Sequence, residues 1–469
     1  MNARIDLRAL AKERPVHFMG VGGAGMFPLA ELLLRSGGRV SGCDAKDSRA
    51  LRDLERLGGT VYVGHDPSHV TDAAALVVTS AVPKDHAEIQ AARAAGIPVL
   101  KRAQALGEWV GMGTVVAIAG THGKTTTTAM TTSILAKAGL DPTGLVGGRV
   151  TEWDGNLRFG SQNLFVVEAD EYDRSFLTLA PDVAVVTNLE ADHLDVYEDL
   201  EGVRRSFVEF LAGVRGGGRV IVCADDQGAS SLLPLVGPSG YTYGTSAGSM
   251  LRVTDVEVGP GGTRGVVWEE GARKGTLEVS IGGRHNLLNA LAAAAAARTL
   301  GAGWPDIFSA LADFAGVGRR FQTIGEAAGV LVIDDYAHHP TELSAALRAA
   351  RSMYGDRRIV AAFQPHLYSR TRDFFAEFGT ALALADVAWI CDVFPAREVP
   401  IPGITGDTVV EAARRAGVAE VHYVEDVELL AGEMASRLNA GDVVLTLGAG
   451  SIEFLGSRLV AALQEPAHA

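Results

Sequence analysis

Residues 115–128, VVAIAGTHGKTTTT, lead from an apolar run through a glycine-rich turn into a polar, threonine-rich segment. This order is typical of a buried β-strand followed by a tight turn and a helix, the unit from which α/β folds are built. We expect the helix to continue through about Lys137. Glycines let the backbone approach phosphate groups, and a helix N-terminus presents unpaired N–H groups and a positive dipole end. The stretch therefore predicts a phosphate-binding loop.

The loop is shorter than the common GxxxxGK[ST] pattern, because position 118 is Ile rather than Gly. An ordinary glycine turn before a helix is the alternative interpretation. In a phosphate loop, Lys124 neutralises the outer phosphates of a nucleotide, and the Thr125 hydroxyl is a ligand of Mg²⁺. We predict nucleotide contacts from the loop and the first helical turn, namely Gly120, Thr121, His122, Gly123, Lys124, Thr125 and Thr126.

A second glycine-rich loop follows a short apolar strand, residues 16–19, and precedes a helical stretch that runs through Arg35. Further strand-like runs lie at 39–44, 60–63, 75–78 and 97–100. This alternation predicts a parallel sheet with a nucleotide-type pocket at the strand ends. GxGxxG followed by an acid is typical of a dinucleotide site, but the same glycines can hold the diphosphate of a nucleoside-diphosphate sugar. The candidate residues are Gly22, Gly23, Ala24, Gly25, Met26 and Asp44.

Two central strands end in polar residues, Glu168 after the run 164–167 and Thr187-Asn188 after the run 183–186. Glu168 would hold Mg²⁺ beside a triphosphate, whereas Asp170, Glu171 and Asp173 fit a solvated acidic loop. His193, which lies among acids, is a candidate metal ligand or phosphate contact, and an ordinary histidine is the alternative. Asn286 and Asn289 share one face at the start of an alanine-rich helix, and capping alone would explain only one of them.

The last part of the chain predicts a third α/β unit, with strands at 330–335, 358–363, 386–393 and 442–447. Asp334-Asp335 and His338-His339 end the first of these strands, and a helix begins at Pro340. The HxxxH spacing and the other ligands of a zinc site are missing, so we do not expect zinc here. Arg370 and Arg372 fit an anion clamp instead.

Composition excludes several functions. With 469 residues the chain is long enough for two to four domains. A formal net charge of −14 argues against binding to nucleic acid or to an anionic membrane. The cysteines form no CxxC, so we expect reduced thiols and neither a zinc centre nor a disulfide. No signal peptide or membrane span is apparent, which favours the cytoplasm, and His65, His69 and His86 are expected at the surface. The cysteines are Cys43, Cys223 and Cys391.

Together the motifs occur in the order typical of the Mur ligases, the ATP-dependent amide-forming enzymes of peptidoglycan precursor synthesis. The motif segments are 120–126, 168–171, 187–193, 285–289 and 318–321. The resemblance spans essentially the whole chain, and residues 17–26 are most similar to the branch that joins L-alanine to UDP-N-acetylmuramate. It implies a role in cell-wall biogenesis, cell shape and cell division, and it leaves a monomer and a homodimer open.

The resemblance also implies an α/β fold of three domains. Residues 1–113 would form a Rossmann-like UDP-sugar-binding domain and residues 114–317 a central P-loop ATPase-type domain. Residues 318–469 would form a Rossmann-like domain that binds the amino acid and closes on ATP.

Roles for individual residues follow from the same resemblance. Catalysis is implied for Lys124, Glu168, His193 and His338. Mg²⁺, with Mn²⁺ as an alternative, is expected at Thr125, Glu168 and His193. Further ATP contacts are implied for Asn286, Asn289, Arg320 and Asp335, and Ser80 joins the UDP-sugar contacts. The amino acid or acyl phosphate is assigned to His338, His366 and Arg370.

Three rival functions stay open on the sequence alone. A related enzyme would add a different amino acid or a recycled peptide to the same sugar nucleotide. A nucleotide-dependent switch or motor would hydrolyse ATP without responding to UDP-N-acetylmuramate. A dehydrogenase would bind a nicotinamide cofactor at the first glycine loop. Phosphate release measured with ATP, UDP-N-acetylmuramate and L-alanine, each omitted in turn, separates them.

Overall fold

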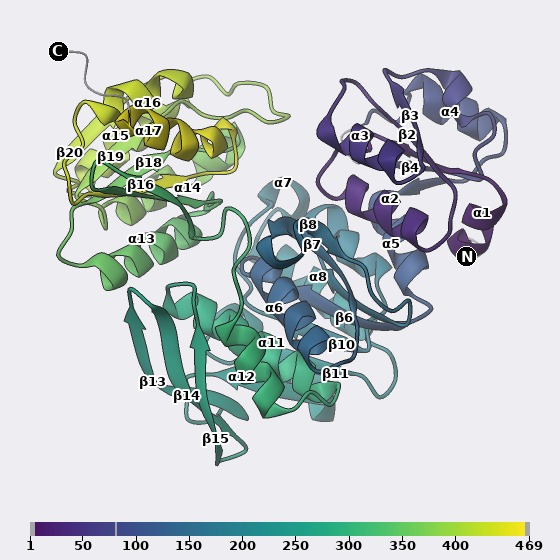
Figure 1. Ribbon diagram of the computed structural model, residues 1–469, viewed down its shortest axis with the longest axis horizontal. Coiled ribbons are helices and arrows are strands. Elements are labelled where there is room, and N and C mark those ends of the chain that lie inside the picture. The colour runs from purple at the N-terminus through teal and green to yellow at the C-terminus, as the bar shows by residue number, and fades with distance from the viewer. Residues whose placement is uncertain (1–4, 80–81, 465–469) are drawn as a thin grey trace. The chain divides into compact units, whose positions relative to one another are not determined.

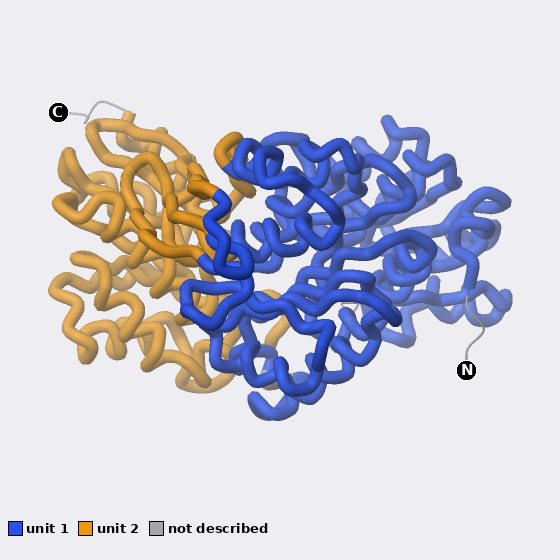
Figure 2. Tube along the Cα trace, turned by 90° about the horizontal axis from the view of Figure 1, so that it is seen from below, with its two compact units in different colours: residues 1–252, 268–274, 289–311 blue, residues 253–267, 275–288, 312–469 orange. Residues whose placement is uncertain are grey.

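A computed structural model describes residues 5–79 and 82–464 and contains three β-sheets surrounded by helices (Figure 1). This arrangement confirms the predicted α/β fold with three domains; the boundaries at 113 and 317 stay a prediction. The chain divides into two compact units (Figure 2). The first comprises residues 1–252, 268–274 and 289–311, and the second comprises residues 253–267, 275–288 and 312–469. None of the described helices has the length and apolar character needed to cross a membrane.

The N-terminal sheet is parallel and has the strand order β3-β2-β1-β4-β5. Its strands are β1 (Val16–Met19), β2 (Val40–Asp44), β3 (Thr60–Val63), β4 (Ala75–Val78) and β5 (Val99–Lys101). The helices are α1 (Leu7–Glu13), α2 (Met26–Arg35), α3 (Arg49–Arg56), η1 (Pro67–Val70), α4 (Ala87–Ala94) and α5 (Arg102–Val110). β1 lies at the centre, where the strand order reverses, so the glycine loop after it opens at the position where doubly wound sheets bind ligands.

The second sheet has ten strands in the order β15-β14-β13-β12-β11-β10-β6-β9-β7-β8. The first five in sequence are β6 (Thr114–Ala119), β7 (Thr143–Val150), β8 (Gly155–Arg158), β9 (Leu164–Glu168) and β10 (Val183–Val186). The others are β11 (Arg219–Cys223), β12 (Gly240–Gly244), β13 (Leu251–Gly259), β14 (Gly262–Glu269) and β15 (Ala272–Val279). β6 pairs in parallel with both β10 and β9, so the polar residues that end these three strands meet at one edge.

Helices and short 3₁₀ turns complete this segment. They are α6 (Lys124–Lys137), η2 (Thr151–Trp153), η3 (Tyr172–Thr178), α7 (Leu194–Tyr197), α8 (Leu200–Ala212), α9 (Gln227–Ser230), α10 (Leu233–Val236), η4 (Gly237–Ser239), α11 (Arg284–Thr299) and α12 (Trp304–Ala312). The predicted helix after the phosphate loop is confirmed as α6, and its residues from Thr125 to Leu135 are buried. Thr131 and Thr132 donate hydrogen bonds to the carbonyls of Thr127 and Thr128, which satisfies polar groups in an apolar setting.

The third sheet has the order β16-β17-β21-β18-β19-β20 and is parallel except for the β16–β17 pair. Its strands are β16 (Gln322–Ala327), β17 (Val330–Asp335), β18 (Ile359–Phe363), β19 (Val387–Ile390), β20 (Glu420–Tyr423) and β21 (Val443–Leu447). The helices are α13 (Pro340–Tyr354), α14 (Tyr368–Leu382), α15 (Gly406–Arg415), α16 (Val427–Ala435), η5 (Ser451–Phe454) and α17 (Leu455–Gln464).

Alternate residues of the third sheet belong to two different cores. Leu331 and Ile333 of β17 pack with α13, α14 and α15, whereas Val330 and Val332 pack with α16 and α17. Because successive side chains of a strand point to opposite faces, both faces of this sheet are covered by helices. That is why its strands read in the sequence as continuous apolar runs.

Candidate functional site

Two glycines shape the phosphate loop between β6 and α6. Gly120 and Gly123 have φ angles of +136° and +82°, which side-chain-bearing residues rarely adopt. A Cβ atom at Gly120 would lie 2.0 Å from Thr187 Oγ1, and one at Gly123 would lie 2.4 Å from Asn289 Oδ1. The loop is therefore packed against the end of β10 and against α11. This places Asn289 at the loop, as the sequence predicts.

The ammonium group of Lys124 lies at the start of α6 and points back over the loop. Its Nζ donates hydrogen bonds to the Gly120 carbonyl at 2.6 Å and to Glu171 Oε2 at 2.7 Å. Burial lowers the pKa of Lys124, but the neighbouring carboxylates, Glu171 above all, outweigh it and hold the pKa above its usual value. The lysine is thus a fixed cation at the helix N-terminus, which suits it to phosphate binding.

The prediction that Glu171 lies in a solvated loop is wrong. The sequence favours a solvated acidic loop at this position, yet Glu171 is only 2% exposed and pairs with Lys124. Burial raises the pKa of Glu171 to about 7, against the lowering effect of the Lys124 charge. The reason lies in the chain after β9, where Asp173 and Arg174 both take φ of +53° and turn the segment inward. Three acids within four residues at the end of a buried strand, Glu168, Asp170 and Glu171, were the only signal in the sequence.

Thr125 and Glu168 are brought together, as predicted. Thr125 Oγ1 donates to Glu168 Oε2 at 3.2 Å, and the Gly147 N–H donates to the other carboxylate oxygen at 2.5 Å. A hydroxyl and a carboxylate beside a phosphate loop form an all-oxygen donor set of the kind that Mg²⁺ prefers. The residues present therefore fit this ion.

His193 lies beside the carboxylate that pairs with Lys124. Its Nε2 is 3.9 Å from Glu171 Oε1, and its ring contacts the Tyr172 ring at a centroid distance of 4.9 Å. Its φ of +53° falls in the left-handed region, a conformation that costs energy in a residue with a side chain. The backbone thus holds this imidazole at the predicted site.

The remaining loop residues hold the neighbouring chain. Thr121 Oγ1 accepts a hydrogen bond from the Glu190 N–H at 2.9 Å, and the His122 N–H donates to Asn188 Oδ1 at 2.7 Å. Thr126 is buried in α6. Asn286 is used locally, because its Nδ2 donates to the Gly282 carbonyl at 2.8 Å.

Asp44 holds the first glycine loop from the end of β2. Its Oδ2 accepts a hydrogen bond from the Gly22 N–H at 2.9 Å. The Gly23 carbonyl accepts one from the Met26 N–H at 2.9 Å, where α2 begins. Asp44 therefore fixes the loop itself, in addition to any contact with a ligand. Ser80 lies outside the described residues.

One cavity of about 240 Å³ extends from the first glycine loop to the end of β9 within the first unit. Ala24 and Gly25 of the first glycine loop line one part, and Glu168 and Asp170 beyond β9 line another. Arg102 also lines it and brings a cation that the sequence analysis did not single out. A charged residue directly after strand β5 was the available signal. The first glycine loop thus shares a cavity with Glu168, the carboxylate that accepts a hydrogen bond from Thr125 of α6.

Asp335 is a candidate residue of the second unit whose carboxylate is held in place by the backbone. Its carboxylate accepts backbone hydrogen bonds from Phe321 at 2.7 Å and Ala337 at 2.8 Å. Burial raises the pKa of Asp335 to about 7, against the lowering effect of Arg320. Arg320 also lies over the Tyr336 ring at 5.2 Å. The structure therefore brings Arg320 and Asp335 together.

His338, His366 and Arg370 form a second group in the same unit. The rings of His338 and His366 have centroids 6.0 Å apart, and Arg370 Nη1 lies 3.5 Å from His366 Nδ1. The Tyr336 carbonyl at 3.0 Å fixes His338 Nδ1. Two imidazoles and a buried guanidinium can hold a carboxylate or a phosphate.

Asp335 should make the stability of the protein depend on pH. Its pKa is about 7 in the folded protein and 3.8 ordinarily, so between these values the folded state binds more protons than the unfolded state. Stability should fall as pH rises through this window, by up to about 1.4 kcal/mol per pH unit. Urea unfolding of the full chain at pH 5 and pH 7 should show a smaller fall for Asp335→Asn than for the wild type. Equal falls would contradict the assignment.

Comparisons with known proteins give one family across the chain. Residues 15–112 match the catalytic domain of the Mur ligase family, residues 118–297 the Mur ligase middle domain, and residues 319–450 the Mur ligase glutamate ligase domain. A UDP-N-acetylmuramate–L-alanine ligase from Geotalea daltonii is 44% identical over 450 residues, which is 96% of this chain and 98% of that protein.

Solved structures agree with this result. The UDP-N-acetylmuramate–alanine ligase of Thermotoga maritima has a TM-score of 0.81 at 28% identity and covers 96% of this chain and 99% of its own. A murein peptide ligase from Psychrobacter arcticus has a TM-score of 0.69 at 26% identity, with 97% and 100% covered. The chain is thus similar over its full length to enzymes that act on muramyl substrates.

Proposed function

The chain belongs to the Mur ligase family, and from this premise we propose that it joins L-alanine to UDP-N-acetylmuramate at the expense of ATP. The supporting observation is the cavity of the first unit. It is lined both by the first glycine loop, where a sugar diphosphate would bind, and by Glu168, which would hold Mg²⁺ beside the triphosphate. The work of the protein is then part of peptidoglycan precursor synthesis. We place it in the cytoplasm, where both nucleotides occur and where its three free cysteines would stay reduced.

The chemistry explains why two anion sites are needed. A carboxylate is a poor electrophile, and its oxygen is a poor leaving group. The lactyl carboxylate attacks the γ-phosphate of ATP, which forms an acyl phosphate and releases ADP. The amino group of L-alanine then attacks the acyl carbon, the C–O bond to phosphate breaks, and the amide and inorganic phosphate result. Most of the rate enhancement must come from positioning and from exclusion of water.

We assign the phosphoryl step to residues at the edge of the second sheet. Lys124 neutralises the charge that spreads over the transferring phosphoryl group. Thr125 and Glu168 would hold Mg²⁺, which would polarise the phosphate oxygens when bound. Glu171 keeps the Lys124 ammonium in place before the nucleotide arrives. His193, beside Glu171, is positioned to contact the phosphates or the metal.

The roles of the candidate residues in the second unit are those that the family resemblance implies, and the geometry of these residues supports them. Arg320 and Asp335 are assigned to the phosphates and ribose of ATP. His338, His366 and Arg370 are assigned to the amino acid or the acyl phosphate, because together they offer several donors to an anion.

A phosphate-release assay on the full chain tests the proposal. Release should require ATP, UDP-N-acetylmuramate and L-alanine together, and omission of any one should reduce it to background. Release that ignores the sugar nucleotide would indicate a switch or motor. Release with the sugar nucleotide and a different amino acid or a peptide, but not with L-alanine, would identify another member of the family.

Gly25 gives a direct test of the shared cavity. Its Cβ position faces the Arg102 side chain at 3.1 Å, and both residues line the cavity. Gly25→Leu should therefore raise the KM for UDP-N-acetylmuramate at least about 10-fold and leave the KM for ATP within about twofold. Gly216→Leu is the matched control, since a Cβ at Gly216 meets no atom within 4 Å. An unchanged KM for the sugar nucleotide in Gly25→Leu would exclude this cavity as its site.

A further inference from the structure

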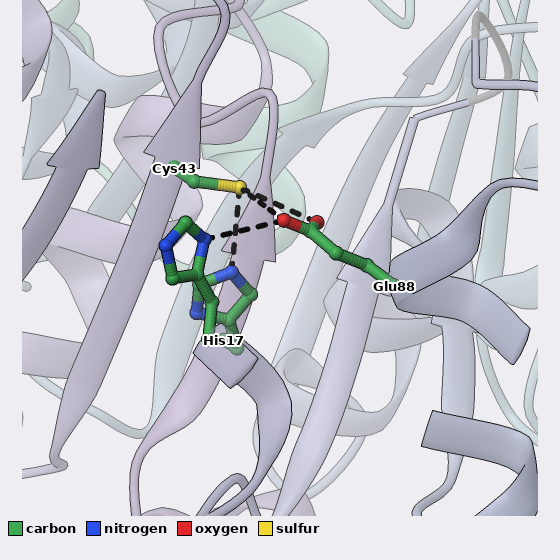
Figure 3. A group of neighbouring side chains, drawn as sticks. His17, Cys43 and Glu88 are labelled. Atoms are coloured by element: carbon green, nitrogen blue, oxygen red, sulfur yellow. Dashed lines mark hydrogen bonds and ion pairs between the residues drawn. The ribbon is translucent and has the colours of Figure 1, made fainter. Parts of the chain in front are cut away.

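Four potential metal ligands converge beside the N-terminal sheet. They are His17 from β1, Cys43 from β2, His69 from η1 and Glu88 from α4. One ligand atom from each lies within 4.8 Å of the others. Figure 3 shows dashed lines from the thiol of Cys43 to the imidazole of His17 and to the carboxylate of Glu88. These three side chains are fully buried, and that of His69 is 13% exposed.

Three of the separations are close to the edges of a small coordination tetrahedron. His17 Nε2 lies 3.4 Å from Cys43 Sγ, which lies 3.6 Å from Glu88 Oε1. His69 Nδ1 lies 3.2 Å from Glu88 Oε1. With Zn–S of about 2.3 Å and Zn–N or Zn–O of about 2.0–2.1 Å, tetrahedral edges measure about 3.3–3.6 Å. An ion of this size needs little movement of the side chains.

Neighbouring groups orient the ligands. The Nδ1 atom of His17 is hydrogen-bonded to Ser41 Oγ at 2.9 Å, which leaves Nε2 to face Cys43. The Asp66 N–H donates to Glu88 Oε1 at 2.8 Å, and the Tyr62 ring stacks on the His69 ring at a centroid distance of 4.1 Å. Outer contacts that fix the ring orientation and the tautomer are typical of metal-bound histidines.

The buried carboxylate of Glu88 needs a neighbouring cation to stabilise its negative charge. Its side-chain interactions within the described residues go to the Asp66 N–H, Cys43, His65 and His69, and include no lysine or arginine. Burying a carboxylate without a cation is costly. A divalent ion within the cluster would supply that cation.

We propose that His17, Cys43, His69 and Glu88 form a binding site for a divalent transition-metal ion, and that Zn²⁺ is the best fit. Two imidazoles, one thiolate and one carboxylate in a tetrahedral arrangement are a zinc donor set. His65 Nδ1 also lies 3.3 Å from Cys43 Sγ, but its side chain is 27% exposed, so we assign the site to the less exposed four. Four protein ligands leave no open position, which makes the site structural.

The site is tied to the first glycine loop through Cys43. The carbonyl of Cys43 accepts hydrogen bonds from the Gly20 N–H at 2.8 Å and the Val21 N–H at 3.1 Å. The next residue, Asp44, holds the Gly22 N–H. A metal ion bound to the Cys43 thiolate would therefore fix the end of β2, and the end of β2 holds the first glycine loop in place.

Cobalt substitution of the full-length protein tests the site. After removal of metals with a chelator, Co²⁺ should bind with one-to-one stoichiometry and give the intense near-ultraviolet band of a cobalt–thiolate bond, with the visible bands of tetrahedral Co²⁺. Zn²⁺ should displace it and raise the Tm. A cobalt–thiolate band reports a cysteine ligand, so binding to the oxygen ligands Thr125 and Glu168 does not interfere. Absence of this band in the wild type would overturn the proposal.

Single cysteine-to-serine variants identify which cysteine forms the cobalt–thiolate bond. Cys43→Ser should abolish the thiolate band, while Cys223→Ser and Cys391→Ser, which alter the two other buried free cysteines, should keep it. Ser41→Ala should weaken Co²⁺ binding about 10- to 100-fold. If Cys43→Ser does not fold, His69→Gln, which alters the most exposed of the four ligands, should weaken binding at least about 10-fold. A band that survives Cys43→Ser, or unchanged affinity in His69→Gln, would contradict the assignment.

Discussion

Lys124→Ala should reduce ligation at least about 10³-fold, because it removes the fixed cation that neutralises the transferring phosphoryl group. The helix N-terminus and the loop N–H groups remain, so ATP should still bind, although more weakly. Binding of UDP-N-acetylmuramate to the first glycine loop should change by less than about threefold in calorimetric titration. Steady-state phosphate release and single-turnover acyl-phosphate formation measure the loss. Near-normal turnover would show that this loop is not the site of phosphoryl transfer.

A double variant separates the catalytic effect from a folding defect. Lys124→Ala leaves the Glu171 carboxylate buried without its ammonium partner, which should lower the Tm. Lys124→Ala/Glu171→Gln removes that unpaired charge and should recover most of the Tm. It should stay as inactive as the single variant. Recovery of activity together with the Tm would mean that the loss came from misfolding.

Glu168→Gln should lower kcat about 10²- to 10³-fold and shift the Mg²⁺ dependence to higher concentrations. The amide keeps the size of the side chain and can still accept the Gly147 hydrogen bond, but it has lost the negative charge that holds a divalent ion. Titration of activity with Mg²⁺ and with Mn²⁺ measures the shift.

Glu152→Gln is the control for this experiment. Like Glu168, Glu152 accepts a hydrogen bond from a hydroxyl of helix α6, in this case that of Ser133. It should leave both kcat and the Mg²⁺ dependence within about twofold. The same Mg²⁺ dependence in Glu168→Gln and in the wild type would remove Glu168 from the metal site.

Local signals made the phosphate loop predictable from the sequence. An apolar run, two glycines, a lysine and a threonine-rich helix lie within 14 residues, and each depends only on its neighbours in the chain. The strands β1, β3 and β4 were predicted with their observed limits for the same reason. That the first glycine loop would line a cavity also followed, because parallel sheets open their ligand sites at the carboxyl ends of strands.

Contacts between distant residues were not predictable in this way. Glu171 reaches Lys124 only because two residues after β9 adopt positive φ angles, and the order of acids in the sequence does not reveal that turn. His69, expected at the surface, turns inward toward Glu88. The cluster around Cys43 depends on the pairing of β1 with β2 and on two covering helices. Its members are spread over residues 17 to 88, without the close cysteine spacing that marks a zinc site in a sequence.

The repeated passage of the chain between the two compact units limits how the protein can be dissected. A fragment that ends at residue 252 would lack residues 289–311, and with them the Asn289 carboxamide that lies against Gly123. A fragment that begins at residue 312 would lack residues 253–267 and 275–288, which belong to the same unit. No single proteolytic cut therefore releases either unit whole, and isolated halves should be poor substitutes for the intact enzyme in binding studies.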